Sequence, residues 1–394
     1  MKKVIALLSV ILLSTCSFAA EFTPIGSLSV LGGYNSFDSD TSNQMANVNL
    51  NLVPSVKFND DIAVIPSYTF EYRVIKEAQE LADGNILFQK GLGNNLYIKP
   101  VITISGDTKL SFKVGYLAQE LQESSDESLS NGIFNYNKTT VGVDYGNKTY
   151  NVGYNLYTVN FPNYTNLIDT TTASQITGNP GNYILDFTAH EFYLMNKFSL
   201  SQKVVLDTTL DYTLKMFSQQ TVLTDYSVYS SDKRMDNSVL INLFPSFALV
   251  PTGPTTISAG LSMNYVFYNS NQGGVDVANS YIANYYSYNE YKIGPTFNFS
   301  FNMIPLKASL SYEFGMRNYT DRLAQDVNGN NLTDKAYVDT SYISMNLSYP
   351  LMENLNLNFM PSFVTSSSNV KYESFYKYNY NASSIFVGLS YDYK

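Results

Sequence analysis

The chain has 394 residues, of which only 14% are charged, and a formal net charge of −9 at pH 7. This acidity gives no support for nucleic-acid binding, which would call for a basic stripe. After residue 19 the sequence has no apolar run of about eighteen residues, which excludes a bundle of transmembrane helices. The 34 tyrosines and 24 phenylalanines favour a membrane signal that is distributed over alternating strands.

The first 19 residues have the three parts of a secretory signal peptide. Lys2 and Lys3 form a basic start, positions 4–13 form an apolar run too short to span a bilayer, and positions 17–19 (Ser-Phe-Ala) form a small-x-small cleavage site. The alternative is a lipoprotein signal that ends at Cys16, although the threonine before this cysteine fits that pattern poorly. The sequence therefore predicts export through the secretory pathway and a mature chain without cysteine or disulfides.

From Pro24 onward apolar and polar residues alternate, which is the period of a strand with one apolar and one polar face. Two stretches, 25–37 and 183–198, alternate poorly, and the second changes parity so that Phe187 and Leu194 cannot share a face unless a β-bulge intervenes. The clear apolar rows lie at 46–58, 62–72, 96–104, 110–116, 141–145, 150–156, 204–216, 239–249, 257–267, 291–303, 306–316, 355–363 and 385–393.

The strongest of these patterns is a hairpin from Tyr291 to Arg317, which turns at Ile304 and Pro305. Strands of a soluble sandwich also alternate, but they usually run about five or six residues, and both strands here are longer than about ten. A membrane-spanning strand needs about nine to eleven tilted residues. Length therefore favours a hairpin of a transmembrane β-barrel.

Short and long connections take turns along the chain, which separates sixteen strands. The short ones are 59–61, 105–108, 146–148, 199–203, 251–254, 304–305 and 350–354, and they are rich in turn-forming residues. The long ones are 38–44, 74–91, 119–132, 160–182, 218–236, 269–287, 318–337 and 366–376. An even number of antiparallel strands places both termini on one side, with short turns in the periplasm and long loops outside.

Taken together, the signal peptide, the alternating strands and the two kinds of connection resemble bacterial outer-membrane β-barrel porins. The likeness covers residues 20–394 as one domain, and it is architectural, without a subfamily motif. It implies an all-β, antiparallel up-and-down barrel in outer-membrane lipid, inserted by the barrel-assembly machinery, with a homotrimer as the usual assembly. One departure is the C-terminus, where Lys394 follows Tyr393 although such barrels commonly end in an aromatic residue.

If the apolar rows face lipid, the other rows face the lumen, and charges of both signs there imply water. The pore-lining candidates are Lys99, Lys113, Lys138, Asp207, Asp211, Lys292, Lys307, Glu313 and Arg317. The lysines at 99, 113 and 138 lie on three consecutive strands and the two aspartates on a later one, an arrangement that predicts a transverse field; scattered solvated charge is the alternative. A channel for passive diffusion of small hydrophilic solutes follows from this interpretation.

A loop that folds into the pore is expected from the same resemblance, because general porins narrow the lumen with the loop between their fifth and sixth strands. Here that loop is 119–132, and it carries the candidates Glu120, Glu123, Asp126 and Glu127. The longer loop 160–182 is the second candidate. The alternative for either one is a solvated external loop, because most such loops face outward.

Other chemistry has little support in the sequence. The only histidine, His190, has Asp186 and Thr188 at spacing two, but a lumen wall residue explains it, so no catalytic site and no enzyme is predicted. The turn that starts at Asp326 begins like a calcium loop, but its twelfth position is Tyr337 rather than Glu. We expect no metal and no cofactor. The alternative function is a non-conducting barrel that acts as an adhesin or structural surface protein through its long loops.

Overall fold

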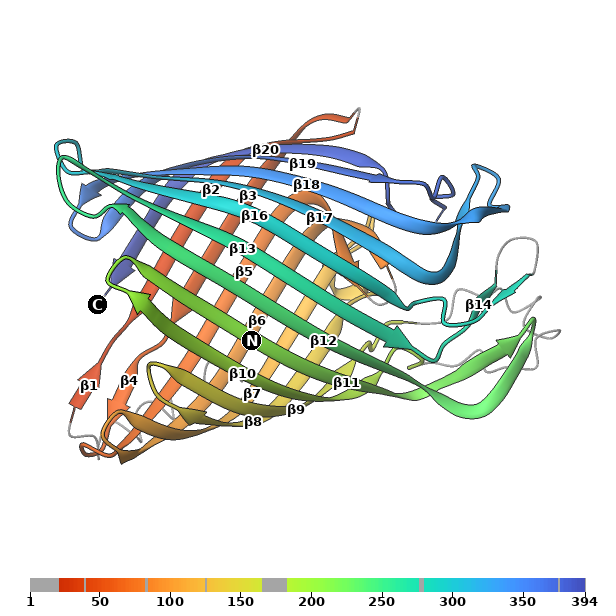
Figure 1. The fold of residues 1–394 in the computed structure, drawn as a ribbon, viewed down its shortest axis with the longest axis horizontal. Helices are drawn as coiled ribbons and strands as arrows, with labels where there is room; N and C mark the ends of the chain where they lie inside the picture. Colours follow the sequence, from red (N-terminus) through yellow and green to blue (C-terminus); the bar gives the residue numbers. More distant parts are fainter. Residues whose placement is uncertain are drawn as a thin grey trace.

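The structure is a computed structural model that describes residues 21–38, 40–81, 84–124, 126–164, 183–275, 280–374 and 376–393. The predicted signal peptide and most of the predicted loop 160–182 lie outside the described residues. The described chain forms one closed, antiparallel β-barrel of sixteen strands (Figure 1). It contains one 3₁₀ turn, Leu129–Asn131, and none of its described helical segments is long and apolar enough to cross a membrane.

The barrel is built from consecutive neighbours, and the first and last strands close it. The sixteen strands are β2 (Gly26–Phe37), β3 (Asp40–Leu52), β5 (Ile62–Leu81), β6 (Gly84–Ser105), β7 (Thr108–Gln122), β8 (Tyr136–Gly146), β9 (Tyr150–Asn160), β10 (Phe187–Ser201), β11 (Val204–Asp225), β12 (Val228–Val250), β13 (Thr255–Ser270), β16 (Tyr288–Phe301), β17 (Leu306–Gln325), β18 (Asn331–Met352), β19 (Leu355–Ser368) and β20 (Tyr380–Tyr393). Closure runs from Gly26 opposite Tyr393 to Phe37 opposite Ala382.

Four short strands lie outside this cycle. At the short-turn end, β1 (Glu21–Thr23) pairs with β4 (Ser55–Lys57), which in turn pairs with β5. At the opposite end, β14 (Gly274–Val275) and β15 (Tyr281–Ile282) form a separate small hairpin within the β13–β16 connection. In Figure 1 the C-terminus and the short turns lie on the left, and the long hairpins lie on the right.

The predicted apolar rows are the exposed, outward rows of the barrel. Val114 is 58% exposed, Ile293 49% and Leu389 43%, although all three are apolar and lie in the middle of strands. Such a belt on a closed barrel is stable when it faces lipid rather than water. The sequence prediction of a transmembrane barrel with about 16 strands, short turns at one end and long connections at the other is thus confirmed.

Three of the predicted long loops are mostly paired strand. β5–β6, β11–β12 and β17–β18 continue as hairpins to connections at 82–83, Tyr226–Ser227 and Asp326–Asn330. In each hairpin the regular ladder ends at a shift of register. The first shift lies between Val74 and Glu77, between Met216 and Thr221, and between Asn318 and Leu323. Bulges bend and twist a strand locally, so the hairpin tips can change direction relative to the wall.

Strand β10 needs no bulge in its middle. Its register with β9 is continuous from Phe187 to Asn196, so the parity change in the sequence is real. Phe192 and Leu194 are exposed on the outer row, whereas Phe187 packs inside against Phe217 at 5.4 Å between ring centroids. The predicted bulge is therefore wrong, because the inner face of β10 is itself apolar near the long-loop end.

Prolines inside strands interrupt pairing on one side without shifting the register. Pro295 lies opposite Leu261 of β13, while the ladder between β16 and β17 has a gap between Ile293 and Thr296 and then resumes in the same register. Pro361 likewise keeps its pairing on one side, with Ile385 of β20, and leaves a gap on the other side, in the ladder between β18 and β19. Because proline lacks only the donor, one neighbouring strand keeps its full ladder.

Candidate functional site

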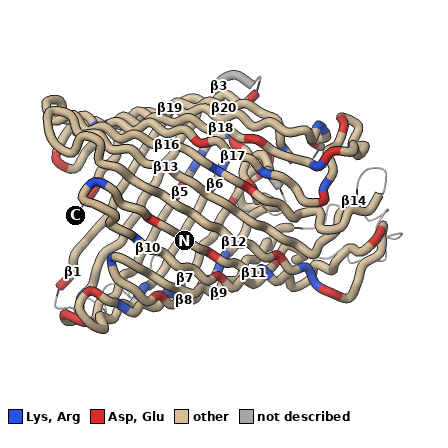
Figure 2. The backbone as a smooth tube through the Cα atoms, viewed as in Figure 1, with Lys and Arg blue, Asp and Glu red and all other residues tan. Residues whose placement is uncertain are grey.

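All nine predicted pore-lining residues lie on the inner rows of the barrel. Lys113, for example, alternates with Phe112 and Val114, which are 45% and 58% exposed on the outer face. Acidic and basic residues are interspersed along the barrel in Figure 2. Several of these charges pair locally: Lys99 Nζ lies 2.9 Å from Asp144 Oδ2, Lys292 Nζ 3.0 Å from Glu290 Oε1, and Lys197 Nζ 3.7 Å from Asp207 Oδ1.

The predicted basic and acidic groups do not face each other across the lumen. Lys113 on β7 and Asp211 on β11 are only four strand steps apart in a barrel of sixteen strands. On β10, between these two strands, Glu191 accepts a hydrogen bond of 2.6 Å from Asn155 Nδ2. Asp211 itself accepts one of 2.9 Å from Thr213 Oγ1. The inner wall there carries local pairs rather than two opposed charged faces.

The hairpin formed by the ends of β5 and β6 leaves the wall and enters the lumen. Its bend is at the bulge where residues 75 and 76 lie opposite residue 89. Gly91 and Gly93 follow on the inner row of β6, so no side chain stands there beside Gln119 and Leu121 of β7. A Cβ at Gly93 would lie 2.9 Å from Gln119 Oε1, closer than real Cβ contacts. The two glycines thus leave room for β7 side chains beneath the bend.

An ion pair fixes this hairpin to a distant part of the wall. Glu80 of β5 receives hydrogen bonds from Arg317 of β17, 2.9 Å from Nη1 to Oε1 and 2.6 Å from Nη2 to Oε2. Strands β5 and β17 are six steps apart around the barrel. Glu290 accepts from Arg317 Nε at 2.7 Å, and the guanidinium lies 4.1 Å from the centroid of the Tyr288 ring. Two carboxylates and one ring therefore hold Arg317 in a fixed, bidentate geometry.

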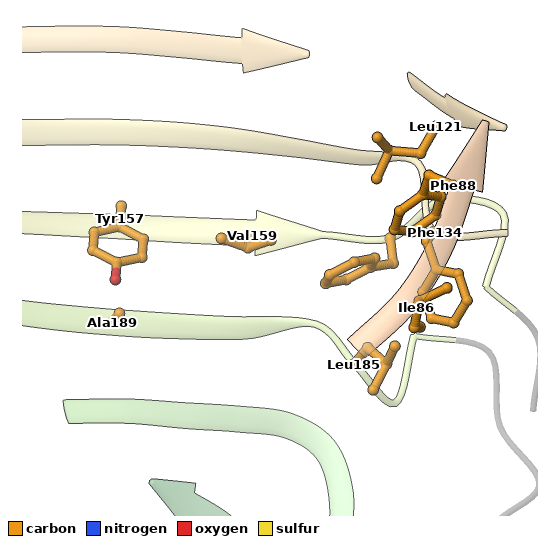
Figure 3. Close-up of a cluster of buried hydrophobic side chains, with 9 residues drawn as sticks. Ile86, Phe88, Leu121, Phe134, Tyr157, Val159, Leu185 and Ala189 are labelled. Atoms are coloured by element: carbon orange, nitrogen blue, oxygen red, sulfur yellow. The ribbon is translucent and has the colours of Figure 1, made fainter. Parts of the chain in front are cut away.

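Apolar side chains hold the hairpin on its other side. Ile86 and Phe88 of β6 are 6% and 1% exposed, and they pack with Leu121, Phe134 and Leu185 from neighbouring strands and loops (Figure 3). The Phe88 and Phe134 rings meet edge to face, with centroids 6.1 Å apart. Burial of each large side chain of this kind contributes about 1.5–3 kcal/mol. The hairpin is thus packed into the mouth and is not a solvated external loop.

A cavity of about 450 Å³ remains between the hairpin and the wall formed by β8 to β17. Nine of its nineteen described lining residues are Phe or Tyr, and four more are aliphatic. The charged residues among them are Glu80, Lys138, Lys215, Arg234 and Arg317. A second cavity, of about 390 Å³, lies on the other side of the hairpin along β2 to β5 and β17 to β20, and Arg73 and Glu77 line it.

Arg234 of β12 is a charged side chain that is buried at the mouth. Its guanidinium lies between the rings of Phe217 and Tyr286, at 4.4 and 4.5 Å from their centroids. Nη2 donates to Asp236 Oδ2 at 2.8 Å, and both side chains are 1% exposed. Tyr268 donates to the same carboxylate. The sequence predicted a long connection over 218–236, and the Arg-x-Asp spacing of two on one strand face was the signal of the pair.

The loop 119–132, which was predicted to narrow the pore, does not reach across the lumen in the described chain. Glu120 continues the outward row of β7, and the described hydrogen bonds of Glu123 and Glu127 are made within the loop itself, for example 3.3 Å from Glu123 N to Glu127 Oε2. Asp126 is exposed. Burial and the neighbouring Glu127 carboxylate raise the pKa of Glu123 to about 7. Within the described chain the segment that reaches the far wall is the β5–β6 hairpin, not residues 119–132.

His190 lies on another face than the sequence predicted, whereas Asp326 holds a polar turn, which was the alternative to a calcium loop. His190 lies on the outer row of β10, where its Nδ1 is 2.7 Å from Tyr154 Oη, so it is not a lumen wall residue. The Asp326 carboxylate accepts from Asn328 N at 2.8 Å and from Asn330 N and Nδ2 at 2.9 Å. Because amide donors occupy both of its oxygens, this turn is held by Asp326 rather than by a cation.

No known family model and no curated protein matches the sequence. Solved structures match at the level of fold. OccAB1 of Acinetobacter baumannii aligns with a TM-score of 0.51 and 13% identity over 95% of this chain and 99% of its own. OmpF of Salmonella typhi, in complex with daunomycin, has a TM-score of 0.47 and 9% identity over 96% and 99%. A trimer form of Vibrio cholerae OmpT gives 0.48 and 10% over 94% and 99%.

Proposed function

We propose that this porin-like outer-membrane β-barrel is a channel for passive diffusion of small hydrophilic solutes, with the β5–β6 hairpin as its constriction. Solutes pass through a lumen whose inner rows are polar, and they pass the hairpin through the cavity between it and the β8–β17 wall.

The observation that carries the proposal is the character of the inner rows. Charges of both signs alternate there with outward apolar side chains, and most of them keep contact with solvent; Lys99 is 31% exposed and Asp207 43%. An ionised group in a dry interior would cost several kcal/mol unless it were paired, so exposed charges on these rows favour a wet lumen. A barrel of sixteen strands is wide enough for such a channel.

The proposed roles follow the position of each side chain. Lys99, Lys113 and Asp211 line the lumen further in, and Asp207 and Lys307 stand near the short-turn end, where Lys307 lines a cavity with Asn298 and Ser348. Lys292 and Glu313 lie on the β16–β17 wall. Lys138 and Arg317 line the cavity beside the hairpin and so contact solutes at the narrowest part.

Planar-bilayer recording of the purified mature protein tests this function. We expect stable, stepwise increases in current at both polarities, because a wet lumen open at both ends conducts ions. A protein that inserts, as shown by heat-modifiable mobility and protease protection, yet gives no current over several voltages would contradict the proposal. That outcome would support a non-conducting surface protein, in which the hairpin closes the lumen and the external hairpins bind other surfaces.

A further inference from the structure

Five consecutive strands of the barrel have inner rows that are rich in amide and hydroxyl side chains and poor in charge. They are β18, β19, β20, β2 and β3, which pair with one another in this order. Examples are Asn47, Asn49 and Asn51 on β3 and Ser344, Asn346 and Ser348 on β18. Along the inner-row positions of 338–348, 356–368, 380–392, 27–37 and 45–51, all within the described chain, the one charged residue is Asp392 at the short-turn end. We call these rows the Asn/Ser wall.

The inner rows of the other strands carry most of the charge of the lumen. Lys99, Lys113 and Asp211 stand on β6, β7 and β11, and Lys292 and Arg317 stand on β16 and β17. An ion that enters the lumen finds charged partners along these rows. The Asn/Ser wall offers hydrogen bonds instead, without an electrostatic preference for either sign.

Side chains of the Asn/Ser wall bond to one another in the way that they can bond to a solute. The hydroxyl oxygens of Ser362 and Ser384 are 2.7 Å apart, and Asn358 Nδ2 donates to Ser390 Oγ at 2.9 Å. Each hydroxyl and each amide can both donate and accept a hydrogen bond. A solute with several hydroxyl groups has the same two capacities, so it can replace water at many points of this wall. An ion would lose hydration there without gaining a charged partner.

The second cavity, of about 390 Å³, lies between part of the Asn/Ser wall and the base of the β5–β6 hairpin. Its volume falls in the range of about 300–1,000 Å³ that ligand pockets occupy. Asn47, Ser344 and Asn346 are among its described lining residues, and so are Tyr342 and Phe386. The two rings supply an apolar surface for the C–H face of a sugar ring, while the amides and hydroxyls bond to its hydroxyl groups.

The hairpin side of the second cavity carries charges of both signs. Arg73 Nε lies 3.2 Å from Glu71 Oε1, and Arg73 Nη1 lies 2.9 Å from Glu77 Oε1. Lys76 lines the cavity beside them. A guanidinium next to a carboxylate can donate to one hydroxyl of a diol and accept from the other. This side of the cavity therefore also suits a solute with neighbouring hydroxyl groups.

We infer that the second cavity binds small uncharged polyhydroxylated solutes, such as sugars and polyols, and that the Asn/Ser wall guides them along one side of the lumen. The inference rests on the channel function proposed above, because solutes reach the cavity through the lumen. It gives the channel two tracks, one for neutral solutes on the Asn/Ser wall and one for ions along the charged rows of the other strands.

Ligand-observed saturation-transfer NMR tests the site without any need for current, on the mature protein in a detergent without sugar groups. The probes are glucose, glucuronate as the same ring with a negative charge, glucosamine at pH 6 as the ring with a positive charge, and cyclohexanol as a ring with a single hydroxyl. We expect glucose to bind most tightly of the four. Binding of any of the other three as tight as that of glucose would overturn the assignment.

Substitution at Asn47 locates the site. Asn47→Leu keeps the size of the side chain but removes its donor and acceptor, so it should weaken glucose binding about fivefold, the effect of one net hydrogen bond. Asn47→Gln, which keeps the amide, should retain more of the affinity. Asn95→Leu is the matched control, because Asn95 is half-buried on the inner row of β6 and is not among the described lining residues of the second cavity. Equal loss in the two Leu variants, or no loss in either, would refute the proposed contact.

Current recordings on the same preparation separate this inference from the channel function. Current without glucose binding would refute the site and leave the channel standing. Glucose binding in a barrel that gives no current would refute the channel while the site remains.

Discussion

The short-turn end of the lumen and its mouth hold charged side chains in different ways. Near the short turns, ion pairs stay exposed: Lys197 and Asp207 are 55% and 43% exposed and 3.7 Å apart. At the mouth, Arg234 and Asp236 are both 1% exposed, 2.8 Å apart and enclosed by aromatic rings. Exposed pairs contribute about 0–1 kcal/mol, whereas removal of one partner of a buried pair costs about 3–5 kcal/mol.

The difference comes from the hairpin that enters the lumen. Where β5 and β6 stay in the wall, the inner rows face water and their charges stay solvated. Where the hairpin bends inward at residues 75 and 76, it places Ile86 and Phe88 in the mouth. The wall that faces the hairpin is lined by aromatic residues. A single bulge thus separates a part of the wall with exposed ion pairs from a mouth in which ion pairs are buried.

Removal of the hairpin should have the largest effect on this contrast. Val74 and Lys90 are register partners, so residues 75–89 can be replaced by an Asn-Gly turn without loss of the ladder below. We expect single-channel conductance to rise on the order of severalfold, because the sixteen-strand lumen is then open at its mouth. Planar-bilayer recording measures the change.

The control for this excision is a variant in which the β17–β18 hairpin is shortened in the same way, by an Asn-Gly turn between register partners. Gln325 and Asn331 are partners, and the turn between them projects outward with Val327 74% exposed. Replacement of residues 326–330 should leave conductance unchanged. Equal conductance in the excised and control variants would show that the β5–β6 hairpin is not the constriction.

Reversal of charge on the inner rows, from the lumen to the cavity beside the hairpin, should have the next largest effect. With Lys99, Lys113 and Lys138 all changed to Glu, we expect ion selectivity to shift towards cations, about severalfold in permeability ratio, since charges that line a narrow aqueous pore set its ion preference. The reversal potential in a salt gradient reports this ratio.

A second triple variant carries the same change of charge at the rim. Three lysines are exposed at the short-turn end: Lys57 ends β4, and Lys148 and Lys203 lie in turns. Their replacement by Glu should shift the reversal potential far less. Similar shifts in both variants would mean that total charge, rather than the position of the three lumen lysines, controls selectivity.

The smallest predicted effect concerns the loop after β7. Burial raises the pKa of Glu123 from 4.5 to about 7, with a further contribution from Glu127, so the structured loop binds a proton more tightly than the open loop. A group of this kind destabilises the structured form as pH rises from 4.5 through about 7. Amide hydrogen exchange of residues 121–135, corrected for intrinsic rates, should therefore be faster at pH 8 than at pH 5.

Glu123→Gln supplies the comparison for this pH effect. The amide stays neutral at every pH, so the variant should show the same corrected exchange at pH 5 and pH 8. Asp126→Asn, at an exposed position of the same loop, should keep the dependence of the unsubstituted protein. A dependence that persists in Glu123→Gln would assign it to another group.

The sequence predicted the spanning strands well, because contact with lipid on one face and water on the other imposes a period of two residues. Tyr291 to Met316 shows this rule in its plainest form, with one apolar row on the outer face of both strands. Beyond the lipid the rule no longer applies. The alternation fades in 74–91, 218–236 and 318–337, yet backbone pairing continues there as hairpins.

The mouth could not be predicted for a second reason. The contact between Glu80 and Arg317 joins residues 237 positions apart and depends on the direction in which the hairpin bends. Phe187 carried a signal, since its break in parity marks the place where the inner face of β10 becomes apolar and lines the cavity. A break in alternation near a strand end thus indicates a packed lumen as readily as it indicates a bulge.

The closure of β2 on β20 sets the order of events in folding. Twelve residue pairs join strands at the two ends of the chain, from Gly26 opposite Tyr393 to Phe37 opposite Ala382. Until synthesis and export of the last strand are complete, β2 and every newest strand present unpaired backbone edges, which are prone to aggregate. The nascent protein therefore depends on protection in transit, and a truncation that removes β20 should leave an open sheet rather than a smaller barrel.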